Sequence, residues 1–364
     1  MGKKEFIDSR ALKSQDGMRL LQELKEGIFR PFVEKVLTSP ELEICFRGNS
    51  NPESVIIYNR NHKIWELSCT SRGYYAKISF DHARYYRNWQ ERLEKINVLF
   101  KSYDKNYKEK SEPNKKAKIG MLSCNLKGCD VTQVKEFADK SYEIIQPYMD
   151  VYFEENPKAE DYFRTAVKLN QTGRNKPNLE EKIMQQHLFS NVLKDMENGY
   201  WAYDLEFSQK YESKEQRKTI LEETGNKLNE PDMLAIEYKE GQPVALVLLE
   251  VKSTEGACIG KSGIVKHYEG MMNYANMEEY QKRRKEEAVQ ILKQYKELGI
   301  YNEMPDYEVV EKMLCEEQQI PVKIAFILTG SAIEKGTQIY KESELLCDFF
   351  EYDEEKNILL PISK

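Results

Sequence analysis

Two apolar stretches joined by a short polar turn constrain the fold of this chain more than any other feature. The first, Met233–Glu237, follows Glu230-Pro231-Asp232, and the second, starting at Val244, ends in Glu250-Val251-Lys252. Short runs rich in aliphatic and β-branched residues are typical of strands. The intervening Lys239-Glu240-Gly241-Gln242 contains a glycine and favours a hairpin turn. We therefore expect two paired antiparallel strands.

The expected hairpin brings three charged side chains to one place. Successive side chains of a strand point to opposite faces, so Glu250 and Lys252 project together while Val251 points away. A hairpin also places Asp232, at the start of the first strand, beside the end of the second. Charges at the tip of a strand that is apolar on both faces are costly unless they are used. The two carboxylates and the ammonium group therefore form a candidate site.

Length and composition predict a soluble protein with two domains. The chain has 364 residues, of which 40% are hydrophobic and 32% charged, and its formal net charge is −6. That charge argues against a protein that coats nucleic acid by bulk electrostatics, but it is compatible with a local basic groove. The seven cysteines are scattered, and we find no signal-peptide pattern and no apolar run of membrane length. We expect reduced thiols, a cytoplasmic location and no membrane partner.

Hydrophobic periodicity divides the chain into two α/β (α+β) domains. In the first, helical patterns flank short β-branched and aromatic runs between Glu41 and Phe80, which predict an antiparallel meander. A stretch rich in Asn, Gly, Pro and charge from Glu154 to Asn178 predicts a linker, so we assign residues 1–160 to an N-terminal α+β domain of unknown role and 161–364 to a second domain. The second domain is predicted as a helix, three strands, a helix and a strand. Residues 209–229 and 330–364 are left unassigned.

Asp232 followed by Glu250-Val251-Lys252 resembles the signature of the PD-(D/E)XK nuclease superfamily, and Pro231 occupies the expected place before the aspartate. The predicted elements between Asn178 and Thr329 resemble its restriction-endonuclease-like αβββαβ core with a central mixed sheet. The resemblance implies a metal-dependent nuclease with Mg²⁺ or Mn²⁺ as cofactor. It favours an endonuclease over an exonuclease. It implies DNA more than RNA as substrate, in phage defence, restriction or repair.

The chemistry of the charged residues agrees with that resemblance. Asp232 and Glu250 are suited to hold a divalent metal ion among water and phosphate oxygens. Lys252 could orient or help to deprotonate the attacking water, or offset charge in the transition state. The resemblance adds the backbone carbonyl of Val251 as a metal ligand. It also adds a catalytic and metal-binding acid from the preceding helix, for which we favour Glu181.

The segment after the motif predicts contacts with phosphate. Gly260-Lys261-Ser262 does not complete a nucleotide-binding P-loop, because the preceding Gly256 is one residue too close. The glycines instead lead into a helix whose N-terminal amides, with Lys261, Lys266 and His267, are expected to meet a nucleic-acid backbone. His267 is also a candidate catalytic residue at the scissile phosphate.

Other interpretations stay open. The fold could serve as a non-catalytic nucleic-acid-binding or sensing module, although clustered carboxylates would repel phosphate. The charged helix Glu278–Leu298 could serve a partner protein in a larger complex or a homo-oligomer. Within that helix, the basic run Lys282–Lys285 is expected to be a solvated face, with a contact to a nucleic-acid backbone as the alternative. Asp204 and Glu206 are expected to share one strand face, either solvated or close to the site.

Overall fold

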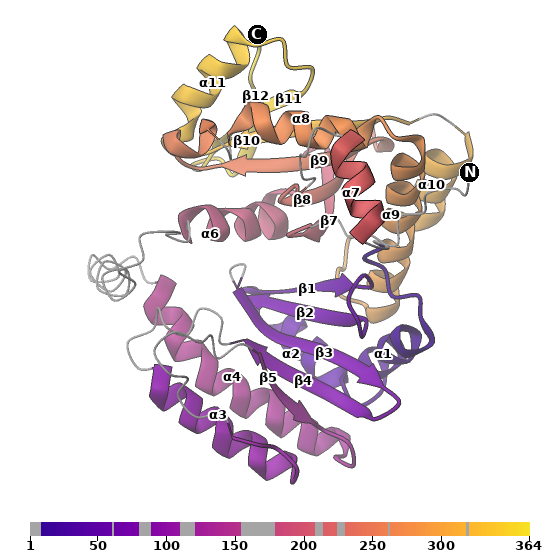
Figure 1. Cartoon of the computed structure of the whole chain (residues 1–364), viewed down its shortest axis with the longest axis vertical. Helices are drawn as coiled ribbons and strands as arrows, with labels where there is room; N and C mark the ends of the chain where they lie inside the picture. Colours follow the sequence, from indigo (N-terminus) through magenta and orange to yellow (C-terminus); the bar gives the residue numbers. More distant parts are fainter. Residues whose placement is uncertain are drawn as a thin grey trace. The chain divides into compact units, whose positions relative to one another are not determined.

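The chain is a mixed α+β protein with two β-sheets. The computed structural model describes residues 9–59, 62–79, 89–109, 121–153, 179–207, 214–223, 230–260, 263–317 and 320–364. The chain divides into two compact units, of which one comprises Leu12–Asn178 and the other Leu179–Lys364 together with the residues up to Ala11 (Figure 1). Among the described helices, none is both long enough and apolar enough to cross a membrane.

The N-terminal unit contains a five-stranded antiparallel sheet in the order β1-β2-β3-β4-β5. Its strands are β1 (Leu42–Arg47), β2 (Ser54–Asn59), β3 (His62–Thr70), β4 (Gly73–Ser79) and β5 (Met121–Asn125). Its described helices are α1 (Gln15–Lys25), α2 (Arg30–Thr38), α3 (Trp89–Tyr103) and α4 (Val131–Phe153). The first four strands follow one another as neighbours, so the predicted meander is confirmed.

Aromatic packing covers one face of this sheet. The Phe32 ring of α2 lies edge-on to the Trp65 ring of β3, with 5.2 Å between the ring centroids. Phe32 also contacts Phe137 of α4, and the Trp65 indole N–H donates to the Ser141 hydroxyl at 3.0 Å. Helices α2 and α4 thus pack against each other and on the face of the sheet that carries the Trp65 side chain. Helices α3 and α4 run side by side (Figure 1).

The C-terminal unit contains a seven-stranded mixed sheet in the order β12-β11-β10-β9-β8-β7-β6. Its strands are β6 (Lys194–Asp195), β7 (Tyr200–Leu205), β8 (Met233–Lys239), β9 (Gln242–Lys252), β10 (Val322–Leu328), β11 (Asp348–Asp353) and β12 (Ile358–Pro361). Strand β10 is parallel to both β9 and β11, and the other neighbours are antiparallel. The four strands β6 to β9 therefore form an antiparallel meander.

The helical segments of this unit separate the strands. They are α6 (Leu179–His187), the π-helical turn η2 (Leu188–Val192), α7 (Lys214–Glu223), the 3₁₀ turn η3 (Glu255–Cys258), α8 (Ile264–Ala275), α9 (Glu278–Leu298), α10 (Tyr307–Glu311), the π-helical turn η5 (Lys312–Glu317) and α11 (Ala332–Glu342). The predicted order of a helix, three strands, a helix and a strand is present as α6, β7, β8, β9, α8 and β10. The unassigned stretches contain α7 and the elements from α11 to β12.

The predicted hairpin joins β8 to β9 through a two-residue turn. Glu240 and Gly241 both have positive φ angles, of 51° and 74°. This is the backbone of a type I′ turn, whose twist matches that of the flanking strands. Lys239 and Gln242 close the hairpin as a register pair. A register shift between Glu237 and Tyr238 follows the turn, and beyond it the pairing runs regularly to Met233 and Leu249. The turn and this shift together align the two strand ends that carry the charged residues.

The two faces of β9 are covered by different helices. Glu250 and Lys252 face α8, because the His267 ring of that helix contacts Glu250. On the same face α11 approaches β10 closely, since a Cβ atom at Gly336 would lie 2.6 Å from the Leu328 side chain. Helix α6 contacts β9, and Figure 1 shows α6 and α8 on opposite sides of β8 and β9. The sheet is thus the middle layer of three.

Candidate active site

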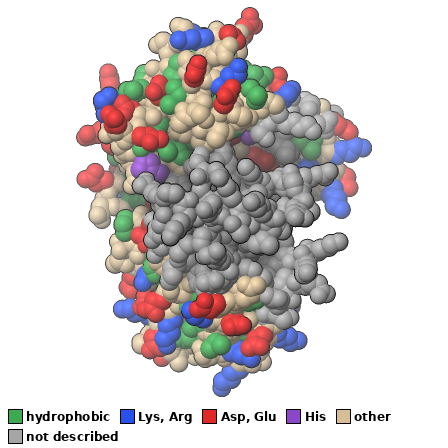
Figure 2. Space-filling view, turned by 90° about the vertical axis from the view of Figure 1, so that its left-hand side faces the viewer, with side chains coloured by type: hydrophobic (Ala, Val, Ile, Leu, Met, Phe, Trp, Pro, Cys, Tyr) green, Lys and Arg blue, Asp and Glu red, His purple; other side chains and the backbone are tan. Residues whose placement is uncertain are grey.

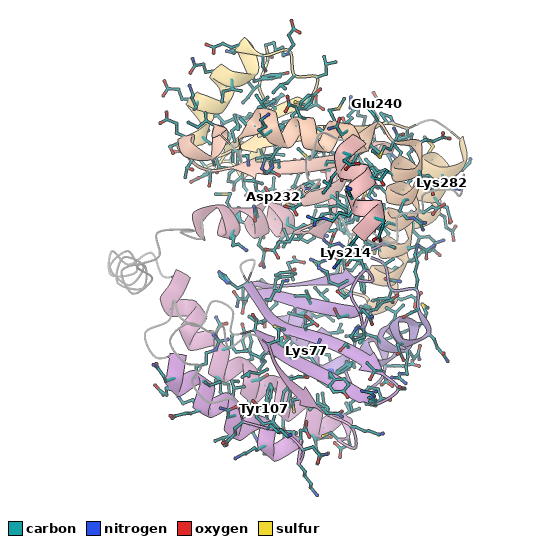
Figure 3. The ribbon with its side chains drawn as sticks, viewed as in Figure 1. Lys77, Tyr107, Lys214, Asp232, Glu240 and Lys282 are labelled. Atoms are coloured by element: carbon teal, nitrogen blue, oxygen red, sulfur yellow. The ribbon has the colours of Figure 1, made fainter. Side chains whose placement is uncertain are left out.

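Asp232 lies at the end of the hairpin where Glu250 and Lys252 emerge. The register pair Met233 and Leu249 places Asp232 opposite Glu250, on the same face of the sheet. The Asp232 Oδ2 atom accepts a hydrogen bond of 2.8 Å from the Val251 N–H. Figure 3 shows Asp232 at the start of β8, at the opposite end of that strand from Glu240. Pairing of β8 with β9 therefore brings this carboxylate to the end of β9.

The backbone N–H and C=O groups of Val251 lie on the side of β9 that faces Asp232. Its N–H binds the Asp232 carboxylate. In a strand, the N–H and C=O groups of one residue point to the same side, whereas neighbouring residues alternate. The Val251 carbonyl is therefore on the Asp232 side of β9, which is the side that the predicted role as a metal ligand requires.

Glu250 receives two positively polarised groups on one oxygen. The Lys252 Nζ atom lies 2.6 Å from Glu250 Oε1, and both side chains are only 4% exposed. The His267 Nδ1 atom lies 2.6 Å from the same Oε1 atom, and the His267 side chain is 28% exposed. Strand alternation brings Lys252 to Glu250, whereas His267 arrives from α8. The structure therefore brings together Asp232, Glu250, Lys252 and His267.

The electrostatic environment keeps Glu250 ionised. Burial raises the pKa of its carboxyl group, because water can no longer solvate the charged form. The Lys252 ammonium and the hydrogen bond from His267 act in the opposite direction, and their combined effect leaves the pKa below its ordinary value. Glu250 is thus a buried carboxylate at neutral pH.

The surroundings of the second carboxylate oxygen of Glu250 show whether this site can accept a cation. Glu250 Oε2 is buried and has no hydrogen-bond partner. An uncompensated anionic oxygen in a buried position is costly, and a metal ion would satisfy it. In the described part of the chain, no group of three or more His, Cys, Asp and Glu side chains converges as a metal site. Carboxylates such as those of Asp232 and Glu250 are ligands of the kind that Mg²⁺ accepts, and this ion is usually held by one or two of them together with water and substrate phosphate.

Three predicted residues are not placed by contacts at this site. Glu181 belongs to α6, but its side chain is outside the described residues, as is the whole of Lys261. Lys266 lies on α8 and is exposed, where its Nζ atom is 3.3 Å from Glu269 Oε2. Lys266 is thus available at the surface of the helix that carries His267, but it does not reach the carboxylates.

The expectation that Lys282–Lys285 forms a solvated face is wrong for Arg284. This side chain is fully buried, and its Nη1 atom donates to Glu287 Oε1 at 2.8 Å. Its guanidinium also lies 4.9 Å from the centre of the Phe207 ring. Figure 3 shows Lys282 well away from Asp232. The basic run therefore contributes a buried ion pair to the unit and is not part of the candidate site.

Asp204 and Glu206 do not share one strand face. Asp204 is buried and lies 3.3 Å from the Arg10 guanidinium. Glu206 follows the last residue of β7 and has a φ angle of +54°, so the strand alternation ends before it. A register shift between Ala202 and Asp204 also disturbs the simple alternation. Neither the bulge nor the Arg10 contact has a signal in the residue spacing, and the sequence prediction missed both.

Charge is spread rather than concentrated on the visible surface. On the face seen in Figure 2, acidic and basic side chains of the described residues alternate without a large patch of either sign. This agrees with a chain that has 55 Lys and Arg against 61 Asp and Glu residues.

Comparisons of the chain with protein-family models, with curated proteins and with solved structures give no match.

Proposed function

We propose that the C-terminal unit is a metal-dependent nuclease that hydrolyses phosphodiester bonds, with DNA preferred over RNA. The observation that carries this proposal is the placement of Asp232 opposite a buried Glu250 that is paired with Lys252. The order α6, β7, β8, β9, α8 and β10 around a mixed sheet supports a restriction-endonuclease-like core. A purely structural ion pair would not require a further carboxylate directly opposite.

Asp232 and Glu250 would hold Mg²⁺ or Mn²⁺, with Oε2 of Glu250 as the available oxygen and the Val251 carbonyl on the same side. When bound, the ion would supply charge stabilisation at the phosphate and a more acidic water. Lys252 keeps a desolvated ammonium group beside Glu250, where it can donate a hydrogen bond to a phosphate oxygen or an attacking water. His267 orients the Glu250 carboxylate from α8.

A cleavage assay with matched variants tests this function. The full chain is incubated with Mg²⁺ or Mn²⁺ and plasmid DNA, linear DNA, single-stranded DNA or RNA. We expect Asp232→Asn, Glu250→Gln and Lys252→Met each to lower the cleavage rate by roughly 100-fold or more, because each removes a group that stabilises the transition state. All variants must keep the wild-type circular dichroism spectrum.

The control is Glu237→Gln, which breaks another Glu and Lys pair of the same sheet. Glu237 Oε2 lies 2.7 Å from Lys323 Nζ, away from the end of β9 that carries Glu250. This variant should cleave like the wild type. Wild-type rates in Asp232→Asn would refute the proposal. Metal-dependent binding of a nucleic acid without cleavage would favour a non-catalytic binding module instead.

A further inference from the structure

Glu206 connects three parts of the C-terminal unit through a single residue. Its N–H donates to the Asp232 carbonyl at 2.7 Å. Its own carbonyl accepts a hydrogen bond of 2.8 Å from the Arg10 guanidinium. Its carboxylate lies 2.9 Å from the Lys182 Nζ atom of α6. Arg10, helix α6 and the start of β8 therefore meet at Glu206.

The backbone of Glu206 adopts a conformation that needs support. Its φ angle is +54°, in the left-handed region that residues with a Cβ atom rarely occupy. Strand pairing between β7 and β8 ends at Leu205 and Met233. The left-handed turn lets Glu206 add one more hydrogen bond, to Asp232 itself. Such outliers persist where the surrounding contacts determine them, and here Arg10 and Lys182 supply those contacts.

We propose that Glu206 is a positioning residue for Asp232. It fixes the backbone of Asp232 from the β7 side, so that the carboxylate stays opposite Glu250 and keeps its hydrogen bond to Val251. This inference rests on the proposed function, in which Asp232 is a metal ligand. Glu206 acts through its backbone hydrogen bond to Asp232 and has no direct role in the reaction.

The two residues that bind Glu206 lie close to the points at which the chain passes between the units. The chain passes from one unit to the other after Ala11 and returns at Leu179. Arg10 directly precedes the first crossing, and Lys182 lies in the first turn of α6, directly after the second. Both residues bind Glu206.

The experiment compares Lys182→Met and Glu206→Gly with the matched control Lys293→Met in the full chain. The Lys182–Glu206 pair is 29% and 26% exposed, and the Lys293–Glu311 pair is 29% and 40% exposed at a distance of 2.8 Å. Mn²⁺ affinity is measured by isothermal titration calorimetry, and the exchange rate of the Val251 amide by NMR. The Val251 amide is informative because its acceptor is the Asp232 carboxylate.

We expect Lys182→Met to weaken Mn²⁺ binding about threefold to fivefold, as for a partly exposed ion pair. Glu206→Gly should weaken it by about the same factor, because it removes the carboxylate that binds Lys182, whereas glycine accepts the left-handed backbone conformation. Both variants should accelerate exchange at Val251 but not at Ile327 of β10, and Lys293→Met should resemble the wild type in both measurements.

The outcomes separate this inference from the proposed function. If Asp232→Asn abolishes Mn²⁺ binding while Lys182→Met and Glu206→Gly match the wild type, the positioning role is wrong and the metal site stands. If the wild type binds no Mn²⁺, the proposed function fails and exchange at Val251 decides the positioning role by itself. Equal acceleration at Val251 and Ile327 would mean general destabilisation and would also overturn the inference.

Discussion

We predict that Arg10 is essential for the stability of the C-terminal unit, although most of that unit is formed by residues 179–364. Its side chain is 3% exposed and lies 3.3 Å from Asp204 of β7, which is 1% exposed. The Arg10 N–H donates to Glu287 of α9, whose other carboxylate oxygen binds Arg284. These four residues form a buried charged cluster. Arg10→Met should therefore destabilise the C-terminal unit severely.

The structure sets the size of this effect. Arg10→Met removes the ion pair with Asp204, the hydrogen bond to the Glu206 carbonyl, and a guanidinium 5.2 Å from the centre of the Phe207 ring. Removing one partner of a buried ion pair costs about 3–5 kcal/mol, mainly because the remaining charge stays buried. Methionine retains the apolar stem, so lost packing adds little. A fragment of residues 161–364 lacks Arg10 and should carry a comparable penalty.

Urea unfolding measures the loss if the reporter belongs to the correct unit. The chain has three tryptophans, and Trp201 is a buried residue of β7. Replacing Trp65 and Trp89 with phenylalanine makes fluorescence report on the C-terminal unit alone. We expect Arg10→Met to lower the free energy of unfolding by about 3–5 kcal/mol. Asp204→Asn added to Arg10→Met should recover part of that loss, because it removes the unpaired charge.

The control replaces a surface lysine of the same unit. Lys356 pairs with Asp353 at 2.8 Å beside the turn between β11 and β12. Lys356→Met should leave the unfolding midpoint unchanged, because exposed ion pairs contribute little. A loss below about 1 kcal/mol for Arg10→Met, the range of a surface pair, would refute the reasoning.

The remaining predictions concern an aromatic cage and the thiols. The Lys194 ammonium lies 4.2 Å from the centres of the Phe189 and Tyr301 rings. Lys194→Met should therefore lower the free energy of unfolding, measured by circular dichroism in urea, by about 2 kcal/mol. An unchanged free energy would contradict a cation–π contribution. Burial raises the pKa of the Cys69 thiol to about 12, so little of its thiolate forms at pH 8. The exposed Cys315 should therefore react first with Ellman's reagent, and Cys315→Ser should remove this fast phase of the reaction. A fast phase that survives this substitution would contradict the assignment.

The sequence could predict those parts of the site that depend on local periodicity. The alternation of a strand places Glu250 and Lys252 on one face, and a hairpin with a glycine in its turn brings Asp232 near them. These relations involve neighbouring residues or a single turn. The structure shows the hairpin and the pair of Glu250 with Lys252 that the residue pattern predicts. The register shift between Glu237 and Tyr238, which sets Asp232 opposite Glu250, has no signal in that pattern.

Relations between distant segments had no such signal. His267 reaches Glu250 only because α8 packs on the face of β9 that carries it. Arg284 has a basic neighbourhood in the sequence that is typical of a solvated face, but packing of α9 places it inside, against Glu287.

The residues whose surroundings could be inferred from the sequence are therefore those whose environment is set by their own strand or turn. Tertiary structure alone decided that Arg10 belongs to the C-terminal unit and that Glu206 leaves the strand to hold Asp232. The physical reason is that strand and helix periods specify which side of an element a residue occupies. Only the packing of complete elements specifies what lies on that side.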